Sequence, residues 1–310
     1  MKPIHPNRYQ VEHEGRQHAV KRGWLGIFHW ENFNFLNSVV EFLVKAVGLF
    51  PRGYRNATDI QLEQVRLEVS RLPQAFEDFR LLWISDLHIE RFDHLPQKVL
   101  DMIQPLQYDL CVFGGDSCFW HYLTDKACRQ MERIAAGLVK KSPVLGILGN
   151  HDFYKIAQLL DSLGVRILLN ENFCLERNGQ KLWFAGVDDC HYFHAEDLDE
   201  AAKGIPAGDC KVLLSHSPEM YKRGAEAGFD MCLSGHTHGG QICLPGGVSI
   251  VSGASVPRPI KEGLWRYENM LGYTCRGAAA SGAAIRFNSR PEITLFTFAR
   301  GKTTFCERIS

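Results

Sequence analysis

The sequence predicts one α/β domain with an N-terminal appendage, and three observations favour this fold class. From residue 66 onward, short apolar runs alternate with segments of helical periodicity. Apolar residues make up 45% of the 310 residues, which is typical of a globular protein with a sizeable core. No internal repeat or low-complexity linker divides the chain. We expect the appendage to span residues 1–65 and the domain to span residues 66–310.

The appendage contains a predicted amphipathic helix at residues 35–50. Its apolar side chains form a wide face, because the polar residues of this segment fall in one narrow stripe on a helix. The charges of Glu41 and Lys45 argue against a membrane span. The polar stripe consists of Asn37, Ser38, Glu41, Lys45 and Gly48.

The residues that flank this helix favour contact with a membrane surface. Aromatic and basic side chains beside an apolar helix face are typical of helices that lie in the interface of a bilayer. Packing of the helix against the domain is the alternative. The flanking residues are Trp24 and Trp30, which precede the helix, and Lys21, Arg22, Arg52 and Arg55, which bracket it.

The first predicted strands of the domain differ in their patterns. Residues 65–72 alternate with the period of two of a half-buried strand, whereas residues 80–88 form an apolar run that ends in polar residues, as in a buried strand. Residues 99–106 then show helical spacing of their apolar side chains. Buried strands are predicted again at residues 109–116 and 144–152.

Helices and strands continue to alternate in the middle of the domain. We expect helices near residues 125–141 and 153–163. An Asn-Gly pair at 178–179 is typical of a tight β-turn and joins strands predicted at residues 171–177 and 181–189.

The last part of the domain completes the α/β pattern. A helix near residues 219–227 separates strands predicted at residues 211–218 and 231–238. Residues 263–298 indicate β-hairpins.

Composition excludes some classes of protein. The 35 Lys and Arg residues balance the 35 Asp and Glu residues, so the chain lacks the basic bias of most nucleic-acid-binding proteins, and we expect no nucleic-acid partner. The ten cysteines include no CxxC pair, which is typical of buried thiols in a reducing compartment. The first residues are polar and lack the apolar segment of a signal peptide, so we expect a cytoplasmic protein.

Five predicted strands end in a carboxylate, amide or imidazole side chain. A strand-end Asp often caps the next helix, and a lone His is often a satisfied polar residue. Side chains at the ends of neighbouring strands of an open α/β sheet converge on one crevice, however, and five such ends favour a common site. The residues are Asp86 and His88, Asp116, Asn150 with His151 and Asp152, His216, and His236 with His238.

These side chains form a mixed oxygen and nitrogen ligand set without thiolate. Such a set suits manganese, iron or zinc rather than calcium. Two divalent ions roughly 3.5–4 Å apart need a bridging carboxylate, and Asp116, at the middle strand end, is the expected bridge. We therefore expect two divalent metal ions, manganese above iron or zinc, and a phosphoester substrate.

The five strand-end blocks resemble those of the calcineurin-like metallophosphoesterases. All five occur in order and at compatible spacing, and the resemblance covers about residues 66 to 300. It implies a four-layer α/β/β/α sandwich built on two mixed sheets. The blocks are SDLH at 85–88, GGD at 114–116, GNHD at 149–152, SHSP at 215–218 and GHTH at 235–238.

The resemblance also implies a role for each strand-end residue. His151 would donate a proton to the leaving oxygen or hold the phosphate, and Asn150 would help to hold it. Asp152 would orient His151, or would only cap the following helix. One metal would be bound by Asp86, His88 and His238, the other by Asn150, His216 and His236, with Asp116 shared by both.

Two further segments resemble a bacterial membrane-associated subgroup that includes the UDP-2,3-diacylglucosamine pyrophosphatases of lipid A biosynthesis. These segments are GHTHGGQI at 235–242 and IRFNSRPEITLFTF at 285–298. Protein phosphatases of the superfamily usually carry GDxxDRG and GNHE, whereas here SCFWHYL follows Asp116 and the fourth block ends in Asp152. This departure argues against a phosphoprotein substrate.

The segment after Asp116 places aromatic side chains beside the expected metals. Phe119, Trp120 and Tyr122 would hold an apolar substrate tail, or would pack beneath the next helix. The function we expect is a dimetal phosphodiesterase or pyrophosphatase acting on a lipid-linked substrate, such as UDP-2,3-diacylglucosamine, as a peripheral protein at the inner face of the cytoplasmic membrane.

Two alternatives come from the same residues. A soluble nucleotide phosphodiesterase would use its N-terminal helix only for packing. A non-catalytic binding scaffold should have lost ligands, whereas this sequence retains all seven expected ligands and His151.

Overall fold

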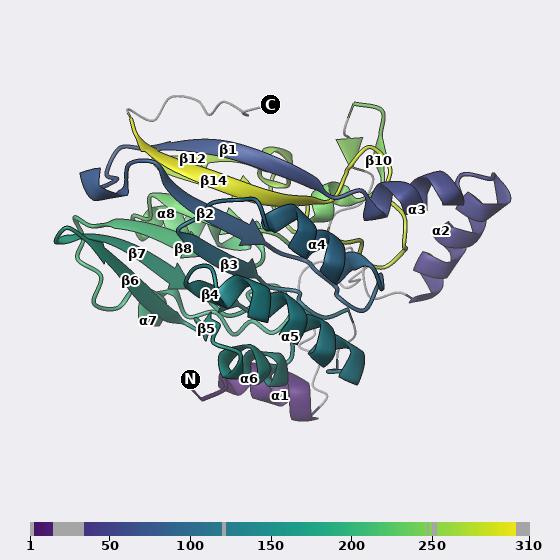
Figure 1. The fold of residues 1–310 in the computed structure, drawn as a ribbon, viewed down its shortest axis with the longest axis horizontal. Helices are drawn as coiled ribbons and strands as arrows, with labels where there is room; N and C mark the ends of the chain where they lie inside the picture. The colour runs from purple at the N-terminus through teal and green to yellow at the C-terminus, as the bar shows by residue number, and fades with distance from the viewer. Residues whose placement is uncertain (1–2, 15–33, 120–121, 247, 250–252, 302–310) are drawn as a thin grey trace.

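Two six-stranded mixed sheets form the centre of the protein (Figure 1). The computed structural model describes residues 3–14, 34–119, 122–246, 248–249 and 253–301. The strand order is β1-β14-β2-β3-β4-β5 in the first sheet and β12-β13-β9-β8-β7-β6 in the second. The prediction of an α/β fold with two mixed sheets is confirmed.

The first sheet packs three helices on its outer face. Alternation along β2 turns Leu82 and Ile84 toward these helices, while Leu81 and Trp83 face the second sheet. The strands are β1 (Gln61–Val69), β14 (Glu292–Arg300), β2 (Phe79–Ile84), β3 (Leu110–Gly114), β4 (Val144–Ile147) and β5 (Arg166–Ile167). The helices are α4 (Leu95–Ile103), α5 (Asp125–Val139) and α6 (Tyr154–Ser162).

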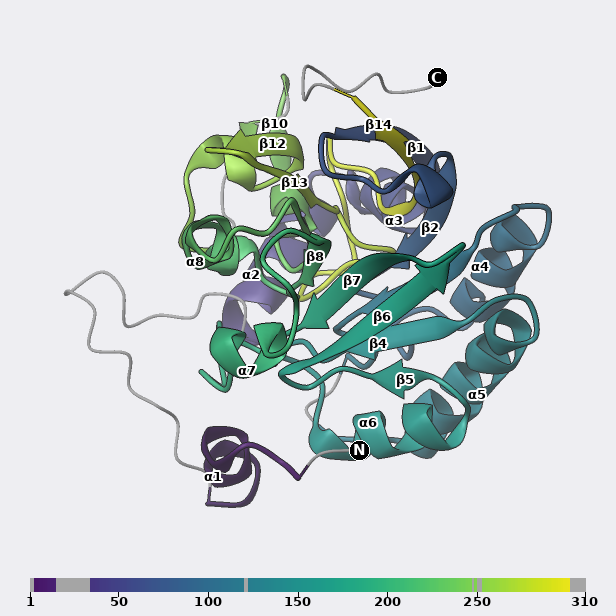
Figure 2. The same cartoon turned by 90° about the vertical axis from the view of Figure 1, so that its left-hand side faces the viewer.

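The second sheet supplies the other two layers. Its inner face meets the first sheet in one apolar core, and its outer face packs against α7 and α8, which lie opposite α4, α5 and α6 in Figure 2. The strands are β6 (Glu171–Arg177), β7 (Gln180–Gly186), β8 (Cys210–Leu214), β9 (Met231–Ser234), β12 (Gly263–Tyr267) and β13 (Met270–Thr274). The helices are α7 (Leu198–Ala202) and α8 (Tyr221–Glu226).

Short elements occupy the connections. Two-residue strands β10 (Cys243–Leu244) and β11 (Val248–Ser249) form a separate antiparallel pair. The 3-10 helices are η2 (Gln74–Phe76), η3 (Pro218–Met220), η4 (His238–Gly240) and η5 (Arg258–Ile260).

The N-terminal segment contains three described helices, α1 (Pro6–Glu14), α2 (Asn34–Ala46) and α3 (Phe50–Thr58). The single helix predicted at residues 35–50 is thus interrupted. Gly48 adopts a φ of 72°, which ends α2, and Pro51 lies in the first turn of α3. None of the helices in these ranges combines the length and hydropathy that a bilayer crossing requires.

The C-terminal strands differ in part from the prediction of β-hairpins. β12 and β13 form an antiparallel hairpin, but β14 lies in the other sheet, parallel to β1 and antiparallel to β2. Apolar side chains on both faces of β14 are buried, which requires a central position. Because β1 begins at Gln61, the first sheet starts before the expected domain boundary at residue 65.

Candidate metal centre

The polar strand ends predicted from the sequence lie together at one edge of the two sheets. Strands β2, β3 and β4 are mutually parallel, as are β8 and β9, so their carboxyl ends share an edge within each sheet. The predicted site residues are all buried there: Asp86, His88, Asp116, Asn150, His151, Asp152, His216, His236 and His238.

Unusual backbone conformations direct several of these side chains inward. Left-handed conformations are uncommon for residues other than glycine, and here they cluster at the strand ends. The φ angles are 53° for Asp86, 38° for His88, 52° for Asp116, 69° for His236 and 51° for His238.

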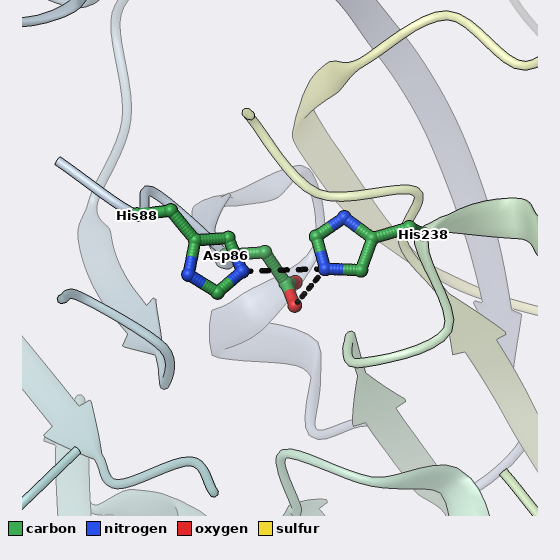
Figure 3. Close-up of side chains that lie close together, drawn as sticks. All are labelled: Asp86, His88 and His238. Atoms are coloured by element: carbon green, nitrogen blue, oxygen red, sulfur yellow. Dashed lines mark hydrogen bonds and ion pairs between the residues drawn. The ribbon is translucent and has the colours of Figure 1, made fainter. Parts of the chain in front are cut away.

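Asp86, His88 and His238 form one group, whose ligand atoms all lie within 4.8 Å of one another (Figure 3). The Nε2 atoms of the two histidines are 3.3 Å apart, and Nε2 of His238 is 3.4 Å from a carboxylate oxygen of Asp86. Nδ1 of His88 lies 3.0 Å from the carbonyl oxygen of Cys118. Since a carbonyl only accepts, Nδ1 carries the hydrogen and Nε2 keeps its lone pair for a metal.

Asp116, His216 and His236 form a second group of the same kind. Nδ1 of His216 donates to the carbonyl oxygen of Gly114 at 2.8 Å, and its buried Nε2 has no hydrogen-bond partner among the described residues. Nδ1 of His236 lies 2.8 Å from Oδ1 of Asn150. This amide oxygen therefore reaches the second group.

Asp116 lies between the two groups. Its Oδ2 is 3.3 Å from Nε2 of His216 and 3.8 Å from Nε2 of His88. Two groups of oxygen and nitrogen donors that share one carboxylate have the composition of a site for two divalent ions. The buried Nε2 of His216 supports this fit. It makes no hydrogen bond with the described residues although it lies 3.3 Å from the Asp116 carboxylate, and a buried polar atom of this kind is costly unless a ligand satisfies it.

The charges of the site are strongly coupled. Burial raises the pKa of Asp86 to about 6 and lowers the pKa of His88 to about 3. Burial alone would also lower the pKa of His216, but the Asp116 carboxylate raises it to about 10. The imidazole of His216 in turn holds the pKa of Asp116 well below its usual range, against the effect of burial.

His151 and Asp152 lie on the loop that follows β4. The backbone amide of His151 donates to Oδ1 of Asp116 at 2.9 Å, and its Nδ1 lies 3.0 Å from the carbonyl oxygen of Phe119. The Asp152 carboxylate accepts hydrogen bonds from three backbone amides, and so it ties the loop after β3 to the loop after β4. The amides are those of Ser117 at 2.9 Å, Cys118 at 3.3 Å and Gly149 at 3.1 Å.

The aromatic segment after Asp116 borders the site. The centroid of the Phe119 ring is 5.8 Å from that of His88 and 6.4 Å from that of His151. Tyr122 is 61% exposed. Trp120 lies outside the described residues, as do Trp24, Trp30, Lys21 and Arg22 of the N-terminal segment.

Two residues at the site are absent from the sequence prediction. His191 follows β7, its ring centroid lies 4.3 Å from that of His236, and its Nδ1 is 3.0 Å from Oε2 of Glu219. The fully buried Arg286 places Nη2 2.9 Å from Nδ1 of His238. The sequence could have indicated His191, because VDDCH at residues 187–191 follows the apolar run of β7 and forms a sixth polar strand end. No local pattern marks Arg286.

Comparison with known proteins gives matches over most of the chain. Residues 79–240 match the family model described as calcineurin-like phosphoesterase. A Danio rerio transmembrane protein with metallophosphoesterase domain is 30% identical over 284 residues, which cover 84% of this chain and 62% of that protein. A Bos taurus protein of the same description is 32% identical over 257 residues, which cover 74% of this chain and 55% of that protein.

A bacterial relative matches over a larger share of its own length. Phosphodiesterase YaeI of Escherichia coli strain K12 is 25% identical over 231 residues, which cover 70% of this chain and 81% of that protein. The matched region thus spans little more than half of the vertebrate relatives, but most of this bacterial one.

Proposed function

Because the chain belongs to the calcineurin-like phosphoesterase family, we propose that it is a dimetal hydrolase that cleaves a phosphodiester or pyrophosphate bond. The observation that carries this proposal is the position of Asp116 between two groups of buried ligand atoms. A shared carboxylate is the feature that distinguishes a two-metal phosphoesterase site from a single-metal site.

We assign one metal to the group that contains Asp86 and the other to the group that contains His216. Asn150 joins the second set, since its Oδ1 lies beside Nδ1 of His236. Oxygen and nitrogen donors without thiolate favour manganese, with iron or zinc as the other candidates. The full assignment is Asp86, His88 and His238 for the first metal, Asn150, His216 and His236 for the second, and Asp116 for both.

The protein's own residues contribute proton transfer and positioning. Two bound divalent ions would supply Lewis-acid stabilisation of the phosphoryl oxygens and a water of lowered pKa. His151 directs Nδ1 to the carbonyl oxygen of Phe119, so Nε2 is the ring atom that exchanges a proton with the leaving oxygen. Asp152 holds the loops that carry Asp116 and His151 in register.

A hydrolysis screen tests this function. The full chain, loaded with manganese, is incubated with a chromogenic phosphodiester, a nucleotide diester and UDP-2,3-diacylglucosamine. We expect hydrolysis that a chelator abolishes and that manganese restores. A metal-loaded protein that hydrolyses none of the three substrates would contradict the proposal, and a preference for the nucleotide diester would favour a soluble nucleotide phosphodiesterase.

The orientation of α2 supports a membrane-associated substrate. One residue of its polar stripe contacts the domain, because Glu41 accepts a hydrogen bond from the backbone amide of Ala284 at 2.9 Å. Several apolar residues of this segment are exposed. We define the α2 surface as Phe42 and Leu43 of α2 together with Val47 and Leu49, which follow it; they are 69%, 57%, 67% and 44% exposed. Exposed apolar side chains of this number are unusual for a helix that only packs against its domain.

Helix α2 is linked to the metal centre through Arg91. The Arg91 guanidinium lies 3.4 Å from Glu41 of α2, and its Cζ lies 4.6 Å from the centroid of the Phe119 ring. Figure 1 shows α2 and α3 projecting beyond the sheets. We therefore propose that the α2 surface inserts into the cytoplasmic face of a membrane and presents a lipid-linked substrate, such as UDP-2,3-diacylglucosamine, to the site.

A further inference from the structure

The N-terminal helix α1 carries an arginine that is completely buried in the phosphoesterase domain. Arg8 has no exposed surface. Its Nε lies 3.0 Å from each carboxylate oxygen of Asp188, and its Nη2 lies 2.5 Å from one of them, although the two residues are 180 positions apart. The guanidinium also lies 3.9 Å from the centroid of the Phe193 ring. A planar, forked and stacked contact of this kind is specific for arginine.

The same arginine reaches the loop that carries His151. Nη1 of Arg8 donates to the carbonyl oxygen of Asp152 at 2.5 Å. One turn further along α1, Oε1 of Glu12 accepts a hydrogen bond from the backbone amide of Tyr154 at 2.9 Å. Figure 1 shows α1 next to α6, whose first residue is Tyr154. Helix α1 therefore holds the backbone at two points directly after His151.

The loop is held from the opposite side by the Asp152 carboxylate. That group binds the amides of Ser117 and Gly149, which flank Asp116 and Asn150 in the chain. With the carbonyl group of Asp152 bound by Arg8 and its carboxylate bound by these amides, this residue has little freedom to rotate. The orientation of its neighbour His151 is therefore set from both sides.

The burial of the charged Arg8 guanidinium favours a positioning role over a general contribution to folding stability. The guanidinium stays charged, because the Asp188 carboxylate outweighs the effect of burial and raises the pKa of Arg8. Buried ion pairs add little to stability compared with apolar residues of similar volume, and they define a geometry instead. Helix α1 also lies outside residues 79–240, which match the family model.

We propose that Arg8 is a positioning residue, which docks α1 behind the loop after β4 and orients His151 for proton transfer to the leaving group. This inference rests on the proposed phosphoesterase function. It makes α1 a part of the active site, although α1 precedes the domain in the chain. A lysine at position 8 would keep the charge but lose the forked contact with Asp188 and the bond to Asp152.

The test compares Arg8→Lys with Asn7→Ala in the full-length, manganese-loaded protein. Asn7 also docks α1, because its side-chain amide donates to the carbonyl oxygen of His194 at 2.6 Å, but none of its hydrogen bonds reaches the His151 loop. We expect Arg8→Lys to lower kcat by roughly 10- to 100-fold on a phosphodiester with a poor leaving group, with KM and metal content unchanged. The loss should be smaller with a good leaving group, and Asn7→Ala should behave like the wild type.

Two further readouts separate positioning from a structural role. In a His151→Ala background, Arg8→Lys should cause no additional loss of kcat, because the group that it positions is absent. Amide hydrogen exchange at residues 149–154 should be faster in Arg8→Lys than in Asn7→Ala. If Arg8→Lys does not fold, Glu12→Ala should show the same pattern with a smaller loss. This variant removes the bond to Tyr154 and the 3.3 Å contact between Oε1 of Glu12 and Nη1 of Arg8, but it keeps the contacts of Arg8 with Asp188 and Asp152.

The experiment distinguishes failure of the proposed function from failure of the inference about Arg8. A wild-type protein that hydrolyses neither a phosphodiester nor a pyrophosphate would remove the proposed function, while the exchange comparison would still test the docking of Arg8. Unchanged exchange at residues 149–154 would overturn the inference whatever the activity. Equal losses across leaving groups, or fully additive losses with His151→Ala, would also overturn it.

Discussion

At the scale of single residues, His151 differs from the imidazoles around it. Of the five histidines predicted at the strand ends, four belong to the two metal-ligand groups found among the described residues. His151 belongs to neither group, although its ring centroid is only 5.0 Å from that of His88. Its backbone is anchored to Asp116 and its ring to Phe119. A substitution of His151 should therefore separate the proposed proton transfer from metal binding.

Substitution of His151 should leave metal binding intact and impair turnover. We expect His151→Ala to retain both metals and to lose roughly 100- to 10,000-fold in kcat, because general acid catalysis contributes on that scale. The loss should grow as the leaving group becomes more basic. Phosphodiesters with leaving groups of graded pKa measure this, with the exposed His94→Ala as control. Equal losses across the series would argue for phosphate positioning in place of proton donation.

At the scale of single elements, α2 presents the unusual feature of exposed apolar side chains. Its contacts to the domain are made by Glu41, which binds Ala284 and Arg91, while the α2 surface stays exposed. The pattern of residues 35–50 predicted one amphipathic helix, whereas α2 ends at Ala46 and α3 begins at Phe50. It did not determine which face would meet the domain, because both faces could find partners.

Substitutions on the α2 surface test its role more sharply than truncation, because residues 1–60 also contain Arg8 and the buried Ala57. We expect Phe42→Ser, Leu43→Ser and Val47→Ser together to weaken binding to anionic vesicles at least tenfold, since each fully inserted apolar side chain contributes about 1.5–3 kcal/mol. Activity on a lipid-linked pyrophosphate should fall more than activity on a soluble diester. Vesicle co-sedimentation and parallel assays measure the two effects.

The matched control replaces apolar residues that are exposed elsewhere. Leu244→Ser with Leu264→Ser removes side chains that are 52% and 36% exposed and that lie outside α2. This pair should bind vesicles like the wild type. A folded, metal-loaded α2 variant that still binds vesicles normally would remove the membrane proposal and the main support for a lipid substrate.

At the scale of the whole molecule, the metal centre joins the two sheets. Asp86, His88 and Asp116 follow strands of the first sheet, whereas His216 and His236 follow strands of the second. Each metal-ligand group contains residues from both sheets. Bound metals should therefore act as cross-links at one end of the sandwich, in addition to the apolar core between the sheets.

Metal removal should lower the thermal stability of the whole domain. A metal present at a hundredfold excess over the Kd of one site raises the free energy of unfolding by about 2.7 kcal/mol. This gain corresponds to a Tm shift of roughly 5–10 °C for a domain of this size. We expect a chelator to lower Tm by at least that amount in the wild type, because two sites lose their metal. In Asp116→Ala, which should lose both metals and essentially all activity, metal addition should not change Tm.

Calorimetry and elemental analysis check this expectation together. Asp93→Ala is the control, because the Asp93 side chain is 86% exposed and belongs to neither group, so this variant should respond to metal like the wild type. Two metals retained in Asp116→Ala would show that the shared assignment of this carboxylate is wrong.

The sequence by itself determined the features whose signals are local. Each predicted site residue directly follows an apolar run, so the pattern that predicts a strand also places SDLH, GGD and GNHD at its end. The α/β class follows from the same alternation, because period-two and period-3.6 patterns distinguish strands from helices within a few residues.

Only the tertiary structure decided which distant segments meet. The pairing of Arg8 with Asp188 joins residues 180 positions apart, and β14 enters the first sheet between β1 and β2 instead of extending the neighbouring hairpin. Arg286 reaches His238, and Glu41 of α2 binds Ala284, for the same kind of reason. These arrangements depend on burial and charge pairing between segments that no periodic pattern relates, so they exist only once the two sheets have packed together.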